Sequence, residues 1–105
     1  MTSQDKIQEM KFLEQNLQNL LFQKQAFQLE LAETKSALKE IGISKDEVFK
    51  VIGQVMIKIE KAKIQNELLD KQNILELRIK TIEKQEDSLA ERLENLRDEI
   101  IKEMK

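Results

Sequence analysis

Several residue types that carry most protein chemistry are missing from this 105-residue sequence, which has no cysteine, histidine, proline, tryptophan or tyrosine. Without cysteine there is neither a disulfide nor a thiolate nucleophile, and without histidine there is no imidazole base and no usual transition-metal site. The two glycines, Gly42 and Gly53, are isolated, so the sequence has no glycine-rich phosphate loop. We therefore expect a protein that is not an enzyme, with no cofactor and no metal site.

The remaining candidates for chemistry have simpler explanations. Carboxylate pairs such as Glu83 with Asp87 have the i, i+4 spacing of a solvated helix face. No apolar run approaches the roughly 18 residues that span a bilayer, and the N-terminus does not resemble a signal peptide. Basic and acidic residues number 18 and 20 and are interspersed, without a basic stripe for nucleic acid. We expect a soluble, cytoplasmic protein that binds neither membrane nor nucleic acid.

What the sequence does contain is a long heptad pattern, in keeping with its 36% of charged residues. The first pattern predicts a helix over residues 4–41, in which only Lys24 and Thr34 are polar among the a and d positions. Those positions are Met10, Leu13, Leu17, Leu20, Lys24, Phe27, Leu31, Thr34, Leu38 and Ile41. Gly42 follows directly, where a left-handed residue often ends a helix.

A second heptad pattern predicts a helix over residues 61–104, interrupted only by Gln72 and Glu86. Its a and d positions are Leu68, Gln72, Leu75, Ile79, Ile82, Glu86, Leu89, Leu93, Leu96 and Ile100. Each helix depends on packing its apolar stripe, and the simplest partner is the other half of the same chain. We therefore predict a mainly α fold in which the two helices form a long antiparallel coiled coil.

Residues 48–59 between the helices alternate like a β-hairpin and are rich in β-branched residues. Gly53 and Gln54 fit a type II′ turn, which pairs Ile52 with Val55 and Val48 with Ile59. Ser44–Glu47 also fits a helix-capping box, and we expect at most one helical turn there. Because the hairpin is apolar on both faces and has two open edges, it predicts assembly with other chains into a sheet or barrel. The alternative is a simple hydrophobic flap between two helices.

Apolar residues also occur at outward heptad positions, where polar residues are normal. They are Phe12, Phe22, Leu29, Ile74, Leu77 and Ile101. In an antiparallel hairpin the two chain ends lie together, so a set of apolar residues gathers at that end as a candidate binding surface. The set comprises Ile7, Met10, Phe12, Leu13, Ile100, Ile101 and Met104.

The hairpin string over residues 48–59, together with the second-helix string over residues 75–86, resembles beta-class prefoldin subunits. The resemblance extends in order over residues 7–103, and the single hairpin is typical of the beta class rather than the alpha class. It implies a hexamer of two alpha and four beta subunits, whose hairpins form an oligomeric β-barrel body. The assembly residues would be Val48, Phe49, Val51, Ile52, Gly53, Val55, Met56, Ile57 and Ile59.

The resemblance also implies an ATP-independent chaperone that holds unfolded polypeptides at the coiled-coil tips and delivers them to a group II chaperonin. The few residues after Ile100 would then limit the apolar area at the tip. Two other classes stay open: a coiled-coil scaffold that tethers one folded partner, and a helical arm that binds RNA. Interspersed charge disfavours the RNA-binding class.

Overall fold

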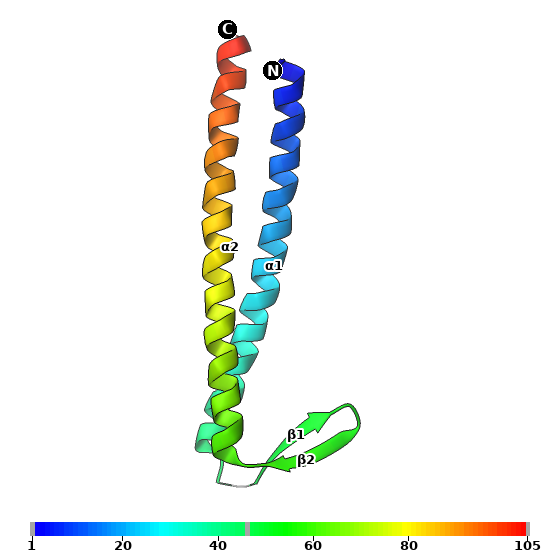
Figure 1. The fold of residues 1–105 in the computed structure, drawn as a ribbon, viewed down its shortest axis with the longest axis vertical. Coiled ribbons are helices and arrows are strands. Elements are labelled where there is room, and N and C mark those ends of the chain that lie inside the picture. Colours follow the sequence, from blue (N-terminus) through cyan, green and yellow to red (C-terminus); the bar gives the residue numbers. More distant parts are fainter. Residues whose placement is uncertain (1, 46, 105) are drawn as a thin grey trace. The chain divides into compact units, whose positions relative to one another are not determined.

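The fold is a pair of long helices joined by a β-hairpin, in a computed structural model that describes residues 2–45 and 47–104. Its elements in chain order are α1 (Ser3–Ile43), β1 (Val48–Ile52), β2 (Val55–Ile59) and α2 (Lys61–Met104) (Figure 1). The mainly α class with an inserted β-hairpin is therefore confirmed. Within the described ranges, neither helix has an apolar stretch long enough to cross a membrane.

Helix α1 begins with a reciprocal cap that the heptad pattern did not reveal. The Asp5 N–H donates to Thr2 Oγ1 at 3.1 Å, and the Thr2 N–H donates to Asp5 Oδ2 at 3.4 Å. These bonds satisfy amides at the first turn that have no partner inside the helix. The spacing of Thr2 and Asp5 is the sequence signal for this cap, and it places the helix start at Ser3.

The predicted end of α1 at Gly42 is wrong, because the helix continues through Gly42 to Ile43. Among the described residues only Gly53 has a positive φ, so Gly42 does not adopt the left-handed conformation. The Ser44 N–H instead bonds the carbonyls of Glu40 and Ile41 at 3.1 and 3.2 Å. The Lys61 ammonium donates to the Ser44 carbonyl at 2.9 Å and to that of Gly42 at 3.4 Å. The carbonyls of Glu40, Ile41 and Gly42 thus accept hydrogen bonds at the end of α1 without a left-handed glycine.

The β-hairpin has the predicted register. Val48 pairs with Ile59, Lys50 with Ile57 and Ile52 with Val55. Gly53 has a φ of +59°, which a type II′ turn requires at its first central residue. No helical turn occurs at Ser44, Lys45 or Glu47, and the part of the expected capping box at Asp46 lies outside the described residues.

The chain forms two compact units, which are described separately. The terminal unit contains the residues up to Ala26 and those from Ile79 onward, and the connector unit contains Phe27–Arg78. In the terminal unit, the start of α1 lies beside the end of α2 (Figure 1). Its core consists of Leu13, Leu93, Leu96 and Ile100, with Met10, Leu17 and Leu89 packed against it.

The a and d positions of both helices, which we call the seam, are buried or half-buried throughout. In the connector unit the buried residues include Leu75, Ile64 and Thr34. The Thr34 hydroxyl donates to the Glu30 carbonyl at 2.8 Å, which makes its burial tolerable. Ile64 lies before the predicted seam, whose first assigned position was Leu68. The 3.5-residue period therefore predicted which residues are enclosed, except at this end of α2.

Candidate interaction surfaces

The β-hairpin presents an apolar surface on both faces. Six of its apolar side chains, which we call the hairpin surface, are between 47% and 66% exposed. They are Phe49, Val51, Ile52, Val55, Met56 and Ile57. Val48 and Ile59, at the base of the hairpin, are half-buried. The described sheet contains only β1 and β2, so the outer edge of each strand has no neighbour within the chain. Such a sheet is marginal in water without further partners.

The two lysines of the hairpin, one on each face, both lie near carboxylates of the same chain. Lys50 lies 3.6 Å from Glu67 of α2, and Lys58 lies 2.8 Å from Glu47. All four side chains are between 43% and 65% exposed, so these pairs contribute little to stability. Their effect is to balance the charge on a surface that is otherwise apolar.

At the end of the terminal unit, the structure divides the seven predicted binding residues into two groups. Leu13 is 2% exposed and Ile100 is 8% exposed, because both pack in the seam core, where Met10 is half-buried. Their inclusion in an exposed surface is therefore corrected: they hold the two helices together. The residues that remain accessible are Ile7, Phe12, Ile101 and Met104, with exposures of 38%, 63%, 46% and 79%.

Heptad geometry further separates these accessible residues. Ile7 and Met104 occupy e positions, and Ile101 occupies a b position, which lies on the same flank of an antiparallel pair. Phe12 occupies a c position on the opposite flank. Ile7, Ile101 and Met104 therefore form one small group, which we call the tip patch.

A cluster of polar side chains closes the seam beside the tip patch. The Lys6 ammonium bonds to Glu103 and lies 3.7 Å from Glu99, while the Ser3 hydroxyl donates to Glu103 at 2.5 Å. Two hydrogen bonds lower the pKa of Glu103: the one from Lys6 has the larger effect, and the one from Ser3 the smaller. The same bond to Glu103 raises the pKa of Lys6 above its ordinary value. The last seam layer of the terminal unit is therefore ionic.

A second ionic contact lies further along the same seam. Lys24 Nζ is 2.8 Å from Glu86 Oε1, and the two side chains are only 20% and 19% exposed. The hydrogen bond to Glu86 raises the pKa of Lys24. Both residues are polar interruptions of the predicted seam, and the heptad pattern alone does not pair them. An antiparallel alignment of the two seams would pair Lys24 with Glu86, because each is the only charged residue in the predicted seam of its helix.

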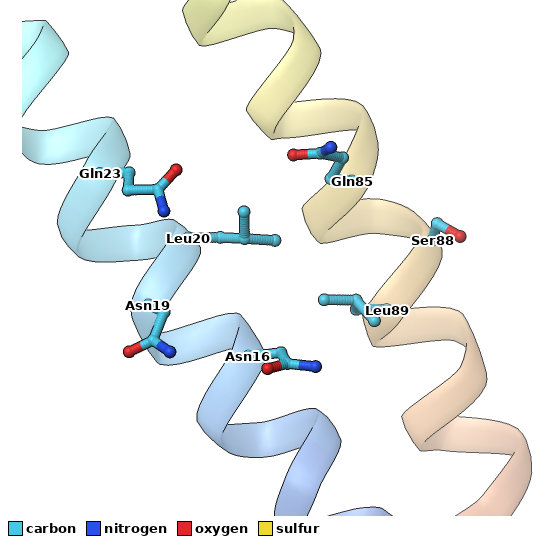
Figure 2. A pocket seen from close by; sticks show the side chains of 7 residues that line it. All are labelled: Asn16, Asn19, Leu20, Gln23, Gln85, Ser88 and Leu89. Atoms are coloured by element: carbon cyan, nitrogen blue, oxygen red, sulfur yellow. The ribbon is translucent and has the colours of Figure 1, made fainter.

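Next to this ionic contact, the flank of the coiled coil carries a groove lined without charged residues. Leu20 and Leu89 point toward each other between the helices, and Gln23 and Gln85 face the same space from opposite sides (Figure 2). Asn16, Asn19 and Ser88 complete the lining. The uncharged amides surround a leucine layer of the seam, and we interpret the groove as a solvated flank.

The other outward apolar residues are exposed, as their heptad positions predicted. Phe22 and Leu29 of α1 are 59% and 63% exposed, and Ile74 and Leu77 of α2 are 51% and 66% exposed. In the connector unit, the Arg78 guanidinium lies 5.6 Å from the centre of the Phe27 ring, within the range of a cation–π contact. Phe22 belongs to the terminal unit, and Leu29, Ile74 and Leu77 belong to the connector unit.

Comparison with protein families connects these features to known proteins. The family described as "Prefoldin subunit" matches residues 4–105. The prefoldin subunit beta of Thermococcus onnurineus is 40% identical over 89 residues, covering 83% of this chain and 77% of the relative. The prefoldin subunit beta of Pyrobaculum aerophilum is 36% identical over 103 residues, covering 96% of this chain and 82% of the relative.

Solved structures give the same result for the fold. The crystal structure of the prefoldin beta subunit from Thermococcus strain KS-1 superposes with a TM-score of 0.87 at 37% identity. The match covers 93% of this chain and 88% of that one. The prefoldin beta2 subunit of the same strain has a TM-score of 0.73 at 18% identity, covering 83% of this chain and 95% of that one, which supports the fold alone.

Proposed function

The chain belongs to the prefoldin family as a beta-type subunit of this molecular chaperone, and from that premise we propose that it holds unfolded polypeptides without ATP. The observation that carries the proposal is the accessible tip patch. The hairpin surface supports the assembly in which that patch would act, since apolar side chains on both faces of a two-stranded sheet are suited to burial against other chains. A prefoldin subunit acts within an assembly, and this surface is suited to form one.

The assembly that we propose is a hexamer of two alpha and four beta subunits, built by pairing hairpins into a β-barrel body. Open strand edges support edge-to-edge pairing, and the two apolar faces support burial on both sides of the resulting sheet. The assembly residues would be those named from the sequence, over residues 48–59. Gly53 contributes by forming the turn rather than by contact.

Client holding is assigned in this proposal to the tip patch of Ile7, Ile101 and Met104, with Phe12 as a further contact. These side chains are accessible in a unit whose other apolar residues mostly face the seam. Burial of apolar surface contributes about 25 cal/mol per Å², so one small patch binds weakly. Capture would therefore depend on several subunits engaging one client, each raising the effective concentration at the next.

Delivery of the client to a group II chaperonin in the cytoplasm completes the proposal. Apolar contacts form and break without a chemical step, so holding and release would need no nucleotide. The sequence also offers no phosphate-binding loop, since its two glycines are isolated.

The proposal is tested by replacing Ile7, Ile101 and Met104 together with serine. This change leaves Leu13 and Ile100 in place, so the helices should remain paired. With the alpha subunit added, the variant should form the full-size complex but suppress aggregation of a denatured test protein several-fold less well. Light scattering measures the aggregation, and size-exclusion chromatography measures the assembly.

The matched control replaces Leu29, Ile74 and Leu77 with serine, which removes three exposed apolar side chains from the connector unit. Its suppression of aggregation should remain near that of the unchanged chain. If the control loses holding while the tip variant keeps it, the client site is on the helix flanks instead. A scaffold protein, in contrast, would bind one folded partner and leave unrelated unfolded proteins to aggregate in every variant.

A further inference from the structure

The seam of the terminal unit contains ionic layers with a consistent polarity. In the layer of Lys24 and Glu86, the lysine comes from α1 and the glutamate from α2. In the layer of Lys6 and Glu103 at the tip, the arrangement is the same. The Lys6 side chain is only 14% exposed, and that of Glu103 is 35% exposed. Both layers are thus partly enclosed, unlike most surface ion pairs.

This polarity distinguishes the correct helix pairing from others. When α1 pairs with α2, each enclosed lysine meets a glutamate. When two copies of α1 pair in parallel and in register, Lys24 meets Lys24 and Lys6 meets Lys6. When two copies of α2 pair in the same way, glutamates meet instead. A like-charged layer in a partly enclosed seam is unfavourable, because neither charge has a partner or full access to water.

Apolar layers alone do not make this distinction. The remaining core positions of the terminal unit are Met10, Leu17, Leu20, Leu13 and their leucine or isoleucine partners in α2. Leucine packs against leucine in any of these pairings, so α1 could pair with α1 of another copy. The risk is greatest in the proposed assembly, on which this inference rests, because neighbouring helices are held at high local concentration.

We propose that the ionic layers Lys24–Glu86 and Lys6–Glu103 act as partner selectors, which make α1 pair with α2 and exclude pairing between like helices of neighbouring copies. The selection works by penalising the wrong pairs rather than by strengthening the right one. It follows that apolar replacements should preserve stability while abolishing selectivity.

The test uses two disulfide reporters, because the natural chain contains no cysteine. Leu17→Cys with Leu93→Cys reports native pairing, since both side chains belong to the same packed cluster and border the same groove. Leu17→Cys alone reports pairing of two α1 helices, because only a second copy can then supply the other sulfur. A disulfide requires Cα atoms within about 7 Å, so each reporter demands close contact.

The decisive variant replaces Lys6, Lys24, Glu86 and Glu103 with leucine in the otherwise unchanged chain. Its melting temperature should be equal to or above that of the unchanged chain. In the Leu17→Cys background, its interchain disulfide should form at least fivefold more than with the ionic layers intact. No rise in the interchain disulfide, in a variant that remains helical by circular dichroism, would overturn the proposal.

Two controls separate selection from general effects of charge. Reversing all four charges (Lys6→Glu, Lys24→Glu, Glu86→Lys, Glu103→Lys) keeps opposite charges across each layer, so interchain disulfide should stay as low as in the unchanged chain. A high yield there would contradict the proposal.

The flank pair Lys35–Glu76, at 3.8 Å and with side chains 55% and 40% exposed, is the matched control. Replacing that pair with leucines should leave the interchain disulfide unchanged. If the unchanged chain with its alpha subunit did not suppress aggregation, while the crosslinking results were as expected, the proposed function alone would fail.

Discussion

The terminal unit and the β-hairpin contain similar apolar residues but differ in where those residues can be buried. In the terminal unit, Leu13, Leu93 and Leu96 are between 2% and 7% exposed, because α1 and α2 cover each other. In the hairpin, Val51 and Met56 are 64% and 66% exposed, although they pair across the strands. Helices can cover one another along a single stripe, whereas an isolated two-stranded sheet leaves both faces uncovered.

The difference assigns separate tasks to the two regions. The terminal unit encloses its core within one chain, so its stability should be largely independent of other subunits. The hairpin should become stable only on assembly. Substitutions can therefore affect folding of the helices and formation of the complex independently, and the predictions below test that separation.

The largest effect is expected from Val51→Asp combined with Ile57→Asp in the hairpin. These residues lie on opposite faces, so at least one charge must be buried in any assembled barrel. Burying an unpaired charge costs several kcal/mol, which is enough to dissociate the complex. The helices should remain intact by circular dichroism, and the variant should elute as a smaller species with or without the alpha subunit.

A matched control places aspartates at Leu29 and Leu77 instead, which are 63% and 66% exposed on the helices. This variant carries the same added charge and should still assemble. Entry of the hairpin variant into the full-size complex would remove the hairpin from the assembly interface.

A smaller effect is expected from Leu96→Ala in the seam. This change should lower the stability of the helices and leave assembly intact. Leu96 is 7% exposed, and a leucine-to-alanine change at such a site costs about 2–5 kcal/mol through lost contacts and a residual cavity. Thermal unfolding followed by circular dichroism should show a lower midpoint, while chromatography should show normal assembly at low temperature. Phe12→Ala removes a larger but 63% exposed side chain and should shift the midpoint much less.

The two glycines give the next contrast. Gly53 has a φ of +59°, so alanine there should destabilise the hairpin by about 1–2 kcal/mol. Gly42 is helical with open space around its missing side chain, so alanine should stabilise α1 by about 0.5–1 kcal/mol. Chemical denaturation measures the Gly42 effect, and the concentration needed for assembly measures the Gly53 effect. If both alanine substitutions were stabilising, or both destabilising, the conformations assigned to Gly42 and Gly53 would be contradicted.

The smallest expected effect is the pH dependence of the tip. Bonds from Lys6 and Ser3 hold the pKa of Glu103 below its ordinary value of 4.5, so this stabilisation is present above pH 4.5 and is lost as the pH falls further. The pKa of Lys6 is raised above 10.5, so its contribution is complete below pH 10.5 and is lost as the pH rises through the raised pKa. The melting temperature should therefore be nearly constant between these limits. Glu103→Gln should flatten the decrease on the acid side.

Local periodicity accounts for the parts of the structure that the sequence predicted. The seam, the strand pairing and the Gly53 turn depend on residue spacing, which is visible in one sequence. The burial of Leu13 and Ile100 follows from the same seam, because a seam position stays enclosed even close to the chain ends. The end of α1 depends on a side chain from the start of α2, Lys61, and no pattern within α1 indicates it.

The pairing within the ionic layers is likewise not visible in local spacing. Lys24 and Glu86 are 62 positions apart, and each alone resembles a defect in an apolar stripe. Their pairing follows only once the register of the two helices is fixed. Which chains would cover the hairpin in the proposed assembly depends on surfaces that this sequence does not contain.

The facing layers also restrict how the length of such a chain can change during evolution. Because Lys24 of α1 meets Glu86 of α2, an insertion between residues 6 and 24 must be matched by one between residues 86 and 103. Both insertions must be about seven residues to keep the apolar stripes facing each other. Lineages should therefore differ in helix length by paired heptads, with both ionic layers retained, and unpaired insertions should accumulate at the chain ends.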